Sequence, residues 1–153
     1  MKHAGTYRWG LVLLTGMLVP ALVLGAAEPE DIIKYRQNSM KASGAHMAAS
    51  SAIIKGKVPF KSQLIVHALA LEQLNHDIAS LFPKGSDFGN TKALDAVWEN
   101  RADFEKAAHA VAIKAKAFTR AAASKDPKTA DAAFKALGDA CSACHKKFRK
   151  KDE

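Results

Sequence analysis

The sequence predicts an all-α protein, folded as an antiparallel up-down-up-down four-helix bundle. Alanine and lysine are abundant, and β-branched residues are scattered rather than gathered in runs. Helix-breaking residues cluster at only a few places, which leaves four long segments between them. Within each segment, apolar or small residues recur at alternating spacings of four and three, as on the inner face of a bundle helix. Short connections between such helices favour antiparallel neighbours.

The first helix is expected over residues 29–54. Pro29 suits a first helical turn, and the acidic residues Glu30 and Asp31 stand at the positive end of the helix dipole. Its inner stripe is interrupted by polar or small residues, namely Gln37, Gly44 and Ser51. These positions indicate either a flat macrocycle lying between the helices or a close crossing of two helices.

The other three helices are expected over residues 60–81, 94–122 and 127–150, with a longer excursion around residues 82–91. The inner stripe of the third predicted helix includes Arg101 among apolar neighbours. The stripe of the fourth contains the two cysteines of the chain, so both thiols are expected on the inner face of the last helix.

The N-terminus has the pattern of a secretory signal peptide. Lys2 and Arg8 precede an apolar run over residues 9–24, which ends in Gly-Ala-Ala at residues 25–27. We expect cleavage after residue 27, an exported domain over 28–153 and a periplasmic location. An uncleaved membrane anchor is the alternative, but the run is short and contains Gly16 and Pro20. No stable membrane insertion is therefore expected after cleavage.

The charge of the exported domain excludes a nucleic-acid-binding protein. The precursor carries a net charge of +8, and removal of the signal takes two basic residues and no acidic one, leaving about +6. This balance is typical of a mildly basic soluble domain. About 126 residues form one domain with one core.

The run Cys141-Ser142-Ala143-Cys144-His145 has the C-x-x-C-H spacing of a c-type haem attachment site. Two thiols must each add to one vinyl group of a single haem, while the following imidazole reaches the iron. On a helix, Cys141 and His145 lie one turn apart on the same face, with Cys144 beside them. The sequence therefore predicts one haem c, covalently bound through two thioethers.

Three other interpretations of these five residues remain. A structural zinc site normally has four Cys or His ligands, and the chain has no second paired cluster. A thioredoxin-like redox pair stands where a strand leads into a helix, and strand signals are weak here. A disulfide between positions i and i+3 of a helix has unfavourable geometry.

The chain resembles the cytochrome c-prime superfamily, the class II c-type cytochromes. Three features carry the resemblance: the run 29–31 leading to Lys-Tyr-Arg-Gln at 34–37, Trp98 followed by Phe104, and the terminal C-x-x-C-H followed by Phe148 and Arg149. They span nearly the whole of residues 28–153. The resemblance implies a four-helix bundle with the haem inside, near the C-terminal helix.

The resemblance also implies roles for single residues. His145 would be the proximal iron ligand, Cys141 and Cys144 the thioether anchors, and Arg36 with Gln37 would lie near the haem propionates. A guanidinium can pair with a carboxylate through two parallel hydrogen bonds, although Arg36 could also be an ordinary surface arginine. Arg149 corresponds to a basic residue beside the proximal histidine in gas-binding members, but it also belongs to a cationic helix end.

Met40 occupies the place above the iron where high-spin members carry a non-coordinating apolar residue. A thioether can ligate haem iron there, and the sequence resembles the low-spin, methionine-ligated branch. The alternative is a methionine that fills the core, and Met47 is the nearest competing sulfur. The remaining mature histidines are expected at the surface or at its boundary: His46, His67, His76 and His109.

These observations predict a periplasmic monohaem electron carrier with His145 and Met40 as axial ligands, which docks with redox partner proteins and forms a possible homodimer. The alternative is a five-coordinate protein that binds nitric oxide or carbon monoxide. A third hypothesis is a haem-free bundle that holds another metal at its Cys-His cluster. No arrangement of acids, bases and nucleophiles in the sequence indicates an enzyme.

Overall fold

The computed structural model describes residues 27–151, so the predicted signal peptide lies, except for residue 27, outside the described residues. Four long helices make up the molecule: α1 (Pro29–Ile54), α2 (Leu64–Asn75), α4 (Arg101–Ala123) and α5 (Pro127–Phe148). Three short helices join them: η1 (Lys61–Gln63), η2 (Ile78–Leu81) and α3 (Ala96–Glu99). The predicted all-α four-helix bundle is confirmed.

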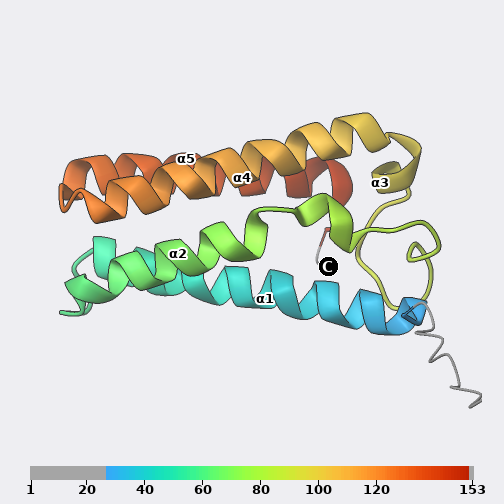
Figure 1. Cartoon of the computed structure of the whole chain (residues 1–153), viewed down its shortest axis with the longest axis horizontal. Helices are drawn as coiled ribbons and strands as arrows, with labels where there is room; N and C mark the ends of the chain where they lie inside the picture. Colours follow the sequence, from blue (N-terminus) through green and yellow to red (C-terminus); the bar gives the residue numbers. More distant parts are fainter. Residues whose placement is uncertain (1–26, 152–153) are drawn as a thin grey trace, which may run out of the picture.

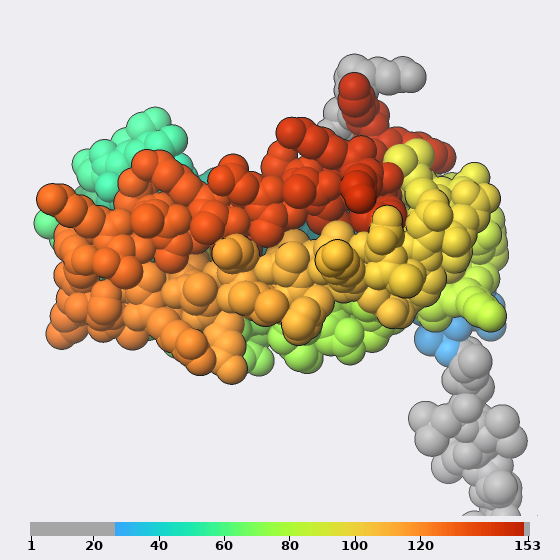
Figure 2. Space-filling view, turned by 90° about the horizontal axis from the view of Figure 1, so that it is seen from above, coloured from blue at the N-terminus to red at the C-terminus, as the bar shows by residue number. Residues whose placement is uncertain are grey.

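The bundle has two layers, with α1 and α2 in one and α4 and α5 in the other (Figure 1). Neighbouring helices pack extensively in the order α1, α2, α4, α5, whereas α1 and α5 make few contacts. Seen from the side of α4 and α5, these two helices lie side by side along the length of the molecule (Figure 2). The space between α1 and α5 is therefore the one least filled by helix packing.

The second and third predicted helices are each interrupted. Residues 76–77 separate α2 from η2, and Asp77 accepts a hydrogen bond from the backbone N–H of Ser80 at 3.3 Å. Asn100 separates α3 from α4 with φ −111° and ψ 50°, outside the helical region. Asn and Asp are weak helix formers because their side chains compete for backbone hydrogen bonds, and they favour helix ends. The interruptions divide the segment between α2 and α4 into two short helices, η2 and α3, joined by a loop.

The core follows the predicted stripes of α4 and α5 closely. Five of the buried side chains come from the predicted stripe of α4: Phe104, Ala108, Val111, Ala115 and Phe118. On α1 the predicted stripe residue Ile33 is buried, but the other buried residues, Arg36, Ser50 and Ile53, lie outside the predicted stripe. The rest of the predicted α1 stripe is only partly buried or, at Gly44, exposed, and Gln37, Met40 and Gly44 lie on the α1/α5 side of the helix.

The C-terminal end of α5 is tied to the segment that precedes α3. An isolated antiparallel bridge joins Ala93 to Arg149, and the Leu94 N–H donates to the Phe148 carbonyl at 3.0 Å. The Lys150 N–H donates to the Lys92 carbonyl at 2.8 Å. The C-x-x-C-H end of α5 is thus held beside the loop that crosses the bundle. Within residues 27–151, no helix has the length and apolar character needed to cross a membrane.

Candidate haem site

A cavity of about 620 Å³ lies between α1, α5 and the segment over residues 78–93. This volume is within the range of about 300–1,000 Å³ found for small-molecule and cofactor sites. The six predicted site residues all line it: Arg36, Gln37, Met40, Cys141, Cys144 and His145. Residues more than 100 positions apart in the sequence are therefore brought to one hollow.

The C-x-x-C-H residues enter the cavity from the last two turns of α5. Cys144 is buried, Cys141 is half-buried and His145 is exposed. Burial raises the pKa of the Cys141 thiol, and burial together with the nearby Cys141 raises the pKa of Cys144 to about 11. Loss of hydration, followed by the positive charge of Arg149, lowers the pKa of His145 below its ordinary value. A lowered pKa favours the neutral imidazole, which is the form that ligates a metal.

Competing uses of these side chains find no support in the structure. Cys141 and Cys144 are both free thiols, so no disulfide joins them. In the part of the chain that the structure describes, no three His, Cys, Asp or Glu side chains form a group that could hold a metal ion. Among the described residues, the structure therefore has neither a disulfide between these thiols nor a zinc site with three or more such ligands.

The floor of the cavity is aromatic and aliphatic. Phe104 meets Phe82 and Phe148 edge to face, with ring centroids 4.8 Å and 5.2 Å apart. Ile78 and Val111 complete this apolar lining. Edge-to-face rings fill space without stacking, and the apolar surface suits a flat macrocycle whose faces are hydrophobic.

The α1 wall accounts for two of the three interruptions in the stripe of that helix, Gln37 and Gly44, but not for Ser51, which does not line the cavity. Met40 and Gly44 line the cavity. A Cβ added to Gly44 would meet no atom within 4 Å, apart from the neighbouring backbone of its own helix. No other helix therefore crosses close to Gly44, so the close-crossing explanation does not apply at this position. The small side chain instead leaves open space beside the cavity, as the macrocycle explanation requires.

Arg36 is 3% exposed and holds the loop after η2. Its Nη1 donates to the Leu81 carbonyl at 3.2 Å and to Ser86 Oγ at 3.0 Å. Its Nη2 donates to the Ser86 carbonyl at 3.0 Å and to Thr91 Oγ1 at 2.9 Å. Burial lowers the pKa of this guanidinium, but the four hydrogen bonds compensate for lost hydration. Arg36 is thus a buried clamp on the loop as well as a cavity-lining residue, and not an ordinary surface arginine.

Gln37, the next residue on α1, contacts the same loop. Its Nε2 donates to the Asn90 carbonyl at 2.6 Å. Gln37 and Arg36 together fix both ends of the segment 81–91 against α1. Lys41, Lys92 and Arg149 add positive charge around the cavity, where an anionic group of a ligand would be favoured.

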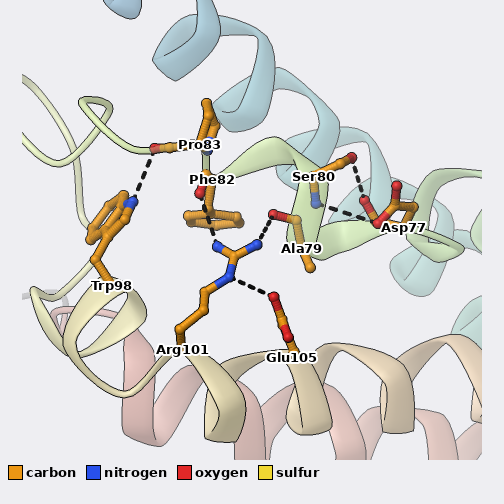
Figure 3. Close-up of polar contacts among 8 residues, drawn as sticks. All are labelled: Asp77, Ala79, Ser80, Phe82, Pro83, Trp98, Arg101 and Glu105. Atoms are coloured by element: carbon orange, nitrogen blue, oxygen red, sulfur yellow. Dashed lines mark hydrogen bonds and ion pairs between the residues drawn. The ribbon is translucent and has the colours of Figure 1, made fainter.

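Arg101 is a second clamp, on the opposite side of η2, that sequence reasoning did not assign to the site. Figure 3 shows its guanidinium between α4 and η2, where Nη1 donates to the Phe82 carbonyl at 2.9 Å and Nη2 to the Ala79 carbonyl at 3.0 Å. Its Nε pairs with Glu105 at 2.8 Å. An arginine in an otherwise apolar helical stripe was the sequence signal for this role.

Trp98 is fixed beside the same segment. Its indole N–H donates to the Pro83 carbonyl at 3.0 Å (Figure 3), and its ring lies near Phe82 with centroids 6.2 Å apart. The wall that carries Phe82 is thus held from α1, α3 and α4. A wall held rigidly by these hydrogen bonds suits a tightly bound cofactor.

Comparison with known proteins decides the family. A model of the family described as Cytochrome C' matches residues 31–149, which is most of the chain and includes every residue of the cavity lining. The chain belongs to the cytochrome c' family. Members of this family bind haem c, and the cavity described above has the cysteines, the histidine and the apolar walls for it.

Individual relatives agree. The cytochrome c' of Pararhodospirillum photometricum is 37% identical over 124 residues, covering 80% of this chain and 99% of the relative. A cytochrome c-556 of Agrobacterium fabrum is 32% identical over 140 residues, covering 91% and 94%. The similarity therefore extends over nearly the full length of the relatives.

Solved structures show the same fold. A variant of cytochrome c' from Alcaligenes xylosoxidans in complex with nitric oxide superposes with a TM-score of 0.77 at 29% identity, covering 83% of this chain and all of that one. A second variant of the same protein, bound to carbon monoxide, gives a TM-score of 0.76 with the same coverage. The chain therefore has the same fold as a cytochrome c' of which variants have been solved with bound nitric oxide and bound carbon monoxide.

Proposed function

We propose that this protein carries one haem c in the α1/α5 cavity and binds a small neutral gas, nitric oxide or carbon monoxide. When bound, the haem supplies an iron centre with one position for such a ligand. The observation that carries the proposal is the shared cavity: both thiols and His145 enter it from α5, and α1 faces them. The gas-bound structures of similar proteins favour this function over electron transfer alone.

Each part of the cavity has a task in this proposal. Cys141 and Cys144 would hold the cofactor through thioethers, and the His145 imidazole would ligate its iron. Lys41, Lys92 and Arg149 would offer positive charge to the propionates, and the Arg36 guanidinium adds to that charge while its hydrogen bonds hold the loop. Phe82, Phe104 and Phe148 exclude water from the macrocycle faces, which lowers competition by water for the gas site.

Optical spectroscopy of the exported protein tests this proposal. The reduced protein should show a high-spin spectrum that changes on addition of carbon monoxide, and the change should saturate. A low-spin spectrum that carbon monoxide leaves unaltered would contradict an open ligand position. An oxidised and reduced pair without gas gives the reference spectra.

A second candidate function is electron transfer with His145 and Met40 as axial ligands. The specific observation that favours it is that Met40, from α1, lines the same cavity as His145, from α5. A thioether is a soft ligand that stabilises ferrous iron and raises the haem potential. In this case the same spectra would be low-spin in both oxidation states. Redox partner proteins and a homodimer belong to this hypothesis as predictions.

We also propose that residues 1–27 direct export and are removed, so that residues 28–153 form the mature domain in the periplasm. The pattern of basic, apolar and small residues supports this, as does the use of the two cysteines for a c-type haem. N-terminal sequencing of the mature protein should begin at Glu28. A mature chain that keeps Met1 would contradict cleavage.

A further inference from the structure

Two histidines outside the haem cavity meet between α1 and α2. The Nδ1 atoms of His46 and His67 are 2.9 Å apart, and the ring centroids are 5.2 Å apart with the planes tilted by 52°. Both side chains are half-buried. The expected surface or boundary location is correct, but their convergence was not foreseen. Neither residue lines the α1/α5 cavity.

The contact between the two rings uses the same atom of each. If both are neutral, one Nδ1 donates a proton and the other accepts it with its lone pair. Among residues 27–151, the only hydrogen bond that the structure gives either ring is to the other ring. The pair therefore presents two imidazole nitrogens that no carbonyl or carboxylate orients for another purpose.

We propose that His46 and His67 form a site for a divalent first-row metal ion of the Cu²⁺ or Ni²⁺ type. Metal–imidazole bonds are about 2.0–2.1 Å long, so two nitrogens at right angles around one ion lie roughly 2.9 Å apart. The Nδ1 separation of 2.9 Å, a hydrogen-bonding distance while the two rings face each other, is close to this spacing, so an ion would replace the shared proton. Right-angled ligands are typical of tetragonal Cu²⁺ and Ni²⁺, whereas tetrahedral Zn²⁺ would need a separation of about 3.4 Å.

The two helices hold the pair in place from both sides. Next to His67, Ala68 is completely buried, and Met47 next to His46 packs against the core. About one helical turn from His46 and two from His67, Asn75 Nδ2 donates to Ser43 Oγ at 3.2 Å and links α2 to α1 again. The backbone positions of the ligands are thus set before an ion binds.

The surroundings define the class of ligand. No third His, Cys, Asp or Glu joins the pair into a larger metal-ligating group within the described residues. Water completes the coordination, which half-buried side chains allow. Such a site takes an exchangeable ion rather than a permanent structural one. Because imidazole is a borderline ligand, Mg²⁺ and Ca²⁺, which prefer oxygen, do not compete.

Binding of Ni²⁺ to the tag-free exported protein tests the site. Ni²⁺ is the probe because it is not reduced by haem as Cu²⁺ would be. Calorimetry should give one Ni²⁺ per chain, and the thermal unfolding midpoint should rise with Ni²⁺ and not with Mg²⁺. His46→Ala and His67→Ala should each weaken binding at least tenfold. The exposed histidines His76 and His109 provide controls, and their alanine variants should bind as the wild type does.

The outcome is independent of the haem proposal. A wild type that binds no Ni²⁺ at millimolar concentration overturns the site, as does binding that His46→Ala and His67→Ala leave unchanged. If an alanine variant fails to fold, His67→Gln keeps a polar side chain at the contact and should lose Ni²⁺ in the same way. Should no haem be attached, Cys141→Ala/Cys144→Ala removes the only thiols that compete for the ion.

Discussion

The guanidinium of Arg36 lies over the ring of Phe82, with Cζ 4.4 Å from the ring centroid. The arginine comes from the first helix, and the phenylalanine from the loop that walls the cavity. The same guanidinium donates four hydrogen bonds to that loop. One residue therefore connects the α1 side of the cavity to its aromatic floor.

Replacing Arg36 by alanine should destabilise the protein by on the order of 3 kcal/mol, because buried loop acceptors such as Ser86 lose their donors. Arg36→Lys should recover only part of the lost free energy of unfolding, because an ammonium group cannot donate to all four acceptors as the planar guanidinium does. Chemical denaturation measures the loss. Lys34→Ala, at an exposed position of the same helix, is the control and should stay within about 0.5 kcal/mol of the wild type. Equal stability of the Arg36 and Lys34 variants would show that the clamp contributes nothing.

Arg101→Ala should destabilise by about 1–2 kcal/mol, because the partly buried Phe82 carbonyl loses the Arg101 donor and the Ala79 carbonyl keeps only the Phe82 N–H. The variant should also broaden the haem spectrum as the Phe82 wall loosens. Arg120→Ala, an exposed position on the same helix, is the matched control for the loss of one positive charge. An Arg101 variant indistinguishable from Arg120→Ala in both readouts would remove Arg101 from the site.

Much of the architecture could be predicted from the sequence, for reasons visible in particular residues. Pro29 and the Ser-Lys-Asp-Pro run at 124–127 mark helix ends that the structure has within a residue or two, because proline and capping residues act locally. The C-x-x-C-H spacing likewise located the α5 side of the cavity. These features could be predicted because they depend on residues that are close together in the sequence.

The remainder depends on contacts between distant segments. Arg36 was expected near propionates, and nothing in its neighbours in the sequence reveals the loop acceptors more than 40 positions away. The breaks at residue 77 and Asn100 allow the segment 78–99 to turn toward Arg101. Periodicity continues through both breaks, so hydrophobic pattern alone predicted unbroken helices.

The cap of α5 gives the protein a defined response to acid. The Asp126 carboxylate accepts hydrogen bonds from the Thr129 hydroxyl and from the backbone N–H groups of Lys128 and Thr129, and these lower its pKa. A lowered pKa in the folded state stabilises the fold above the unfolded value of about 3.9, and this contribution is lost as pH falls through the folded value.

Asp126→Ala should therefore lower the thermal unfolding midpoint at pH 7, and the difference from the wild type should shrink below about pH 4. Thermal unfolding followed by circular dichroism at a series of pH values measures it. Asp139→Ala, at an exposed position in the interior of the same helix, controls for the loss of one carboxylate. A difference that stays constant down to pH 2 would show that the charge of the cap is unimportant.

Met40→Leu separates the two candidate functions. With an open ligand position, wild type and variant should both bind carbon monoxide, with affinities that differ only a few-fold because the two side chains have similar volumes. Met47→Leu, on the same helix, controls for the loss of a sulfur. A low-spin wild type that becomes high-spin and gas-binding only in Met40→Leu would instead establish methionine ligation and electron transfer.

The central claim is that α5 holds a haem c through Cys141 and Cys144 in the α1/α5 cavity. An alkaline pyridine spectrum with the intact mass of the exported protein tests it most directly. The account predicts one haem per chain that resists acid extraction, and none covalently bound in Cys141→Ala/Cys144→Ala. A wild-type chain recovered without covalent haem, from cells that mature other c-type cytochromes, would contradict it.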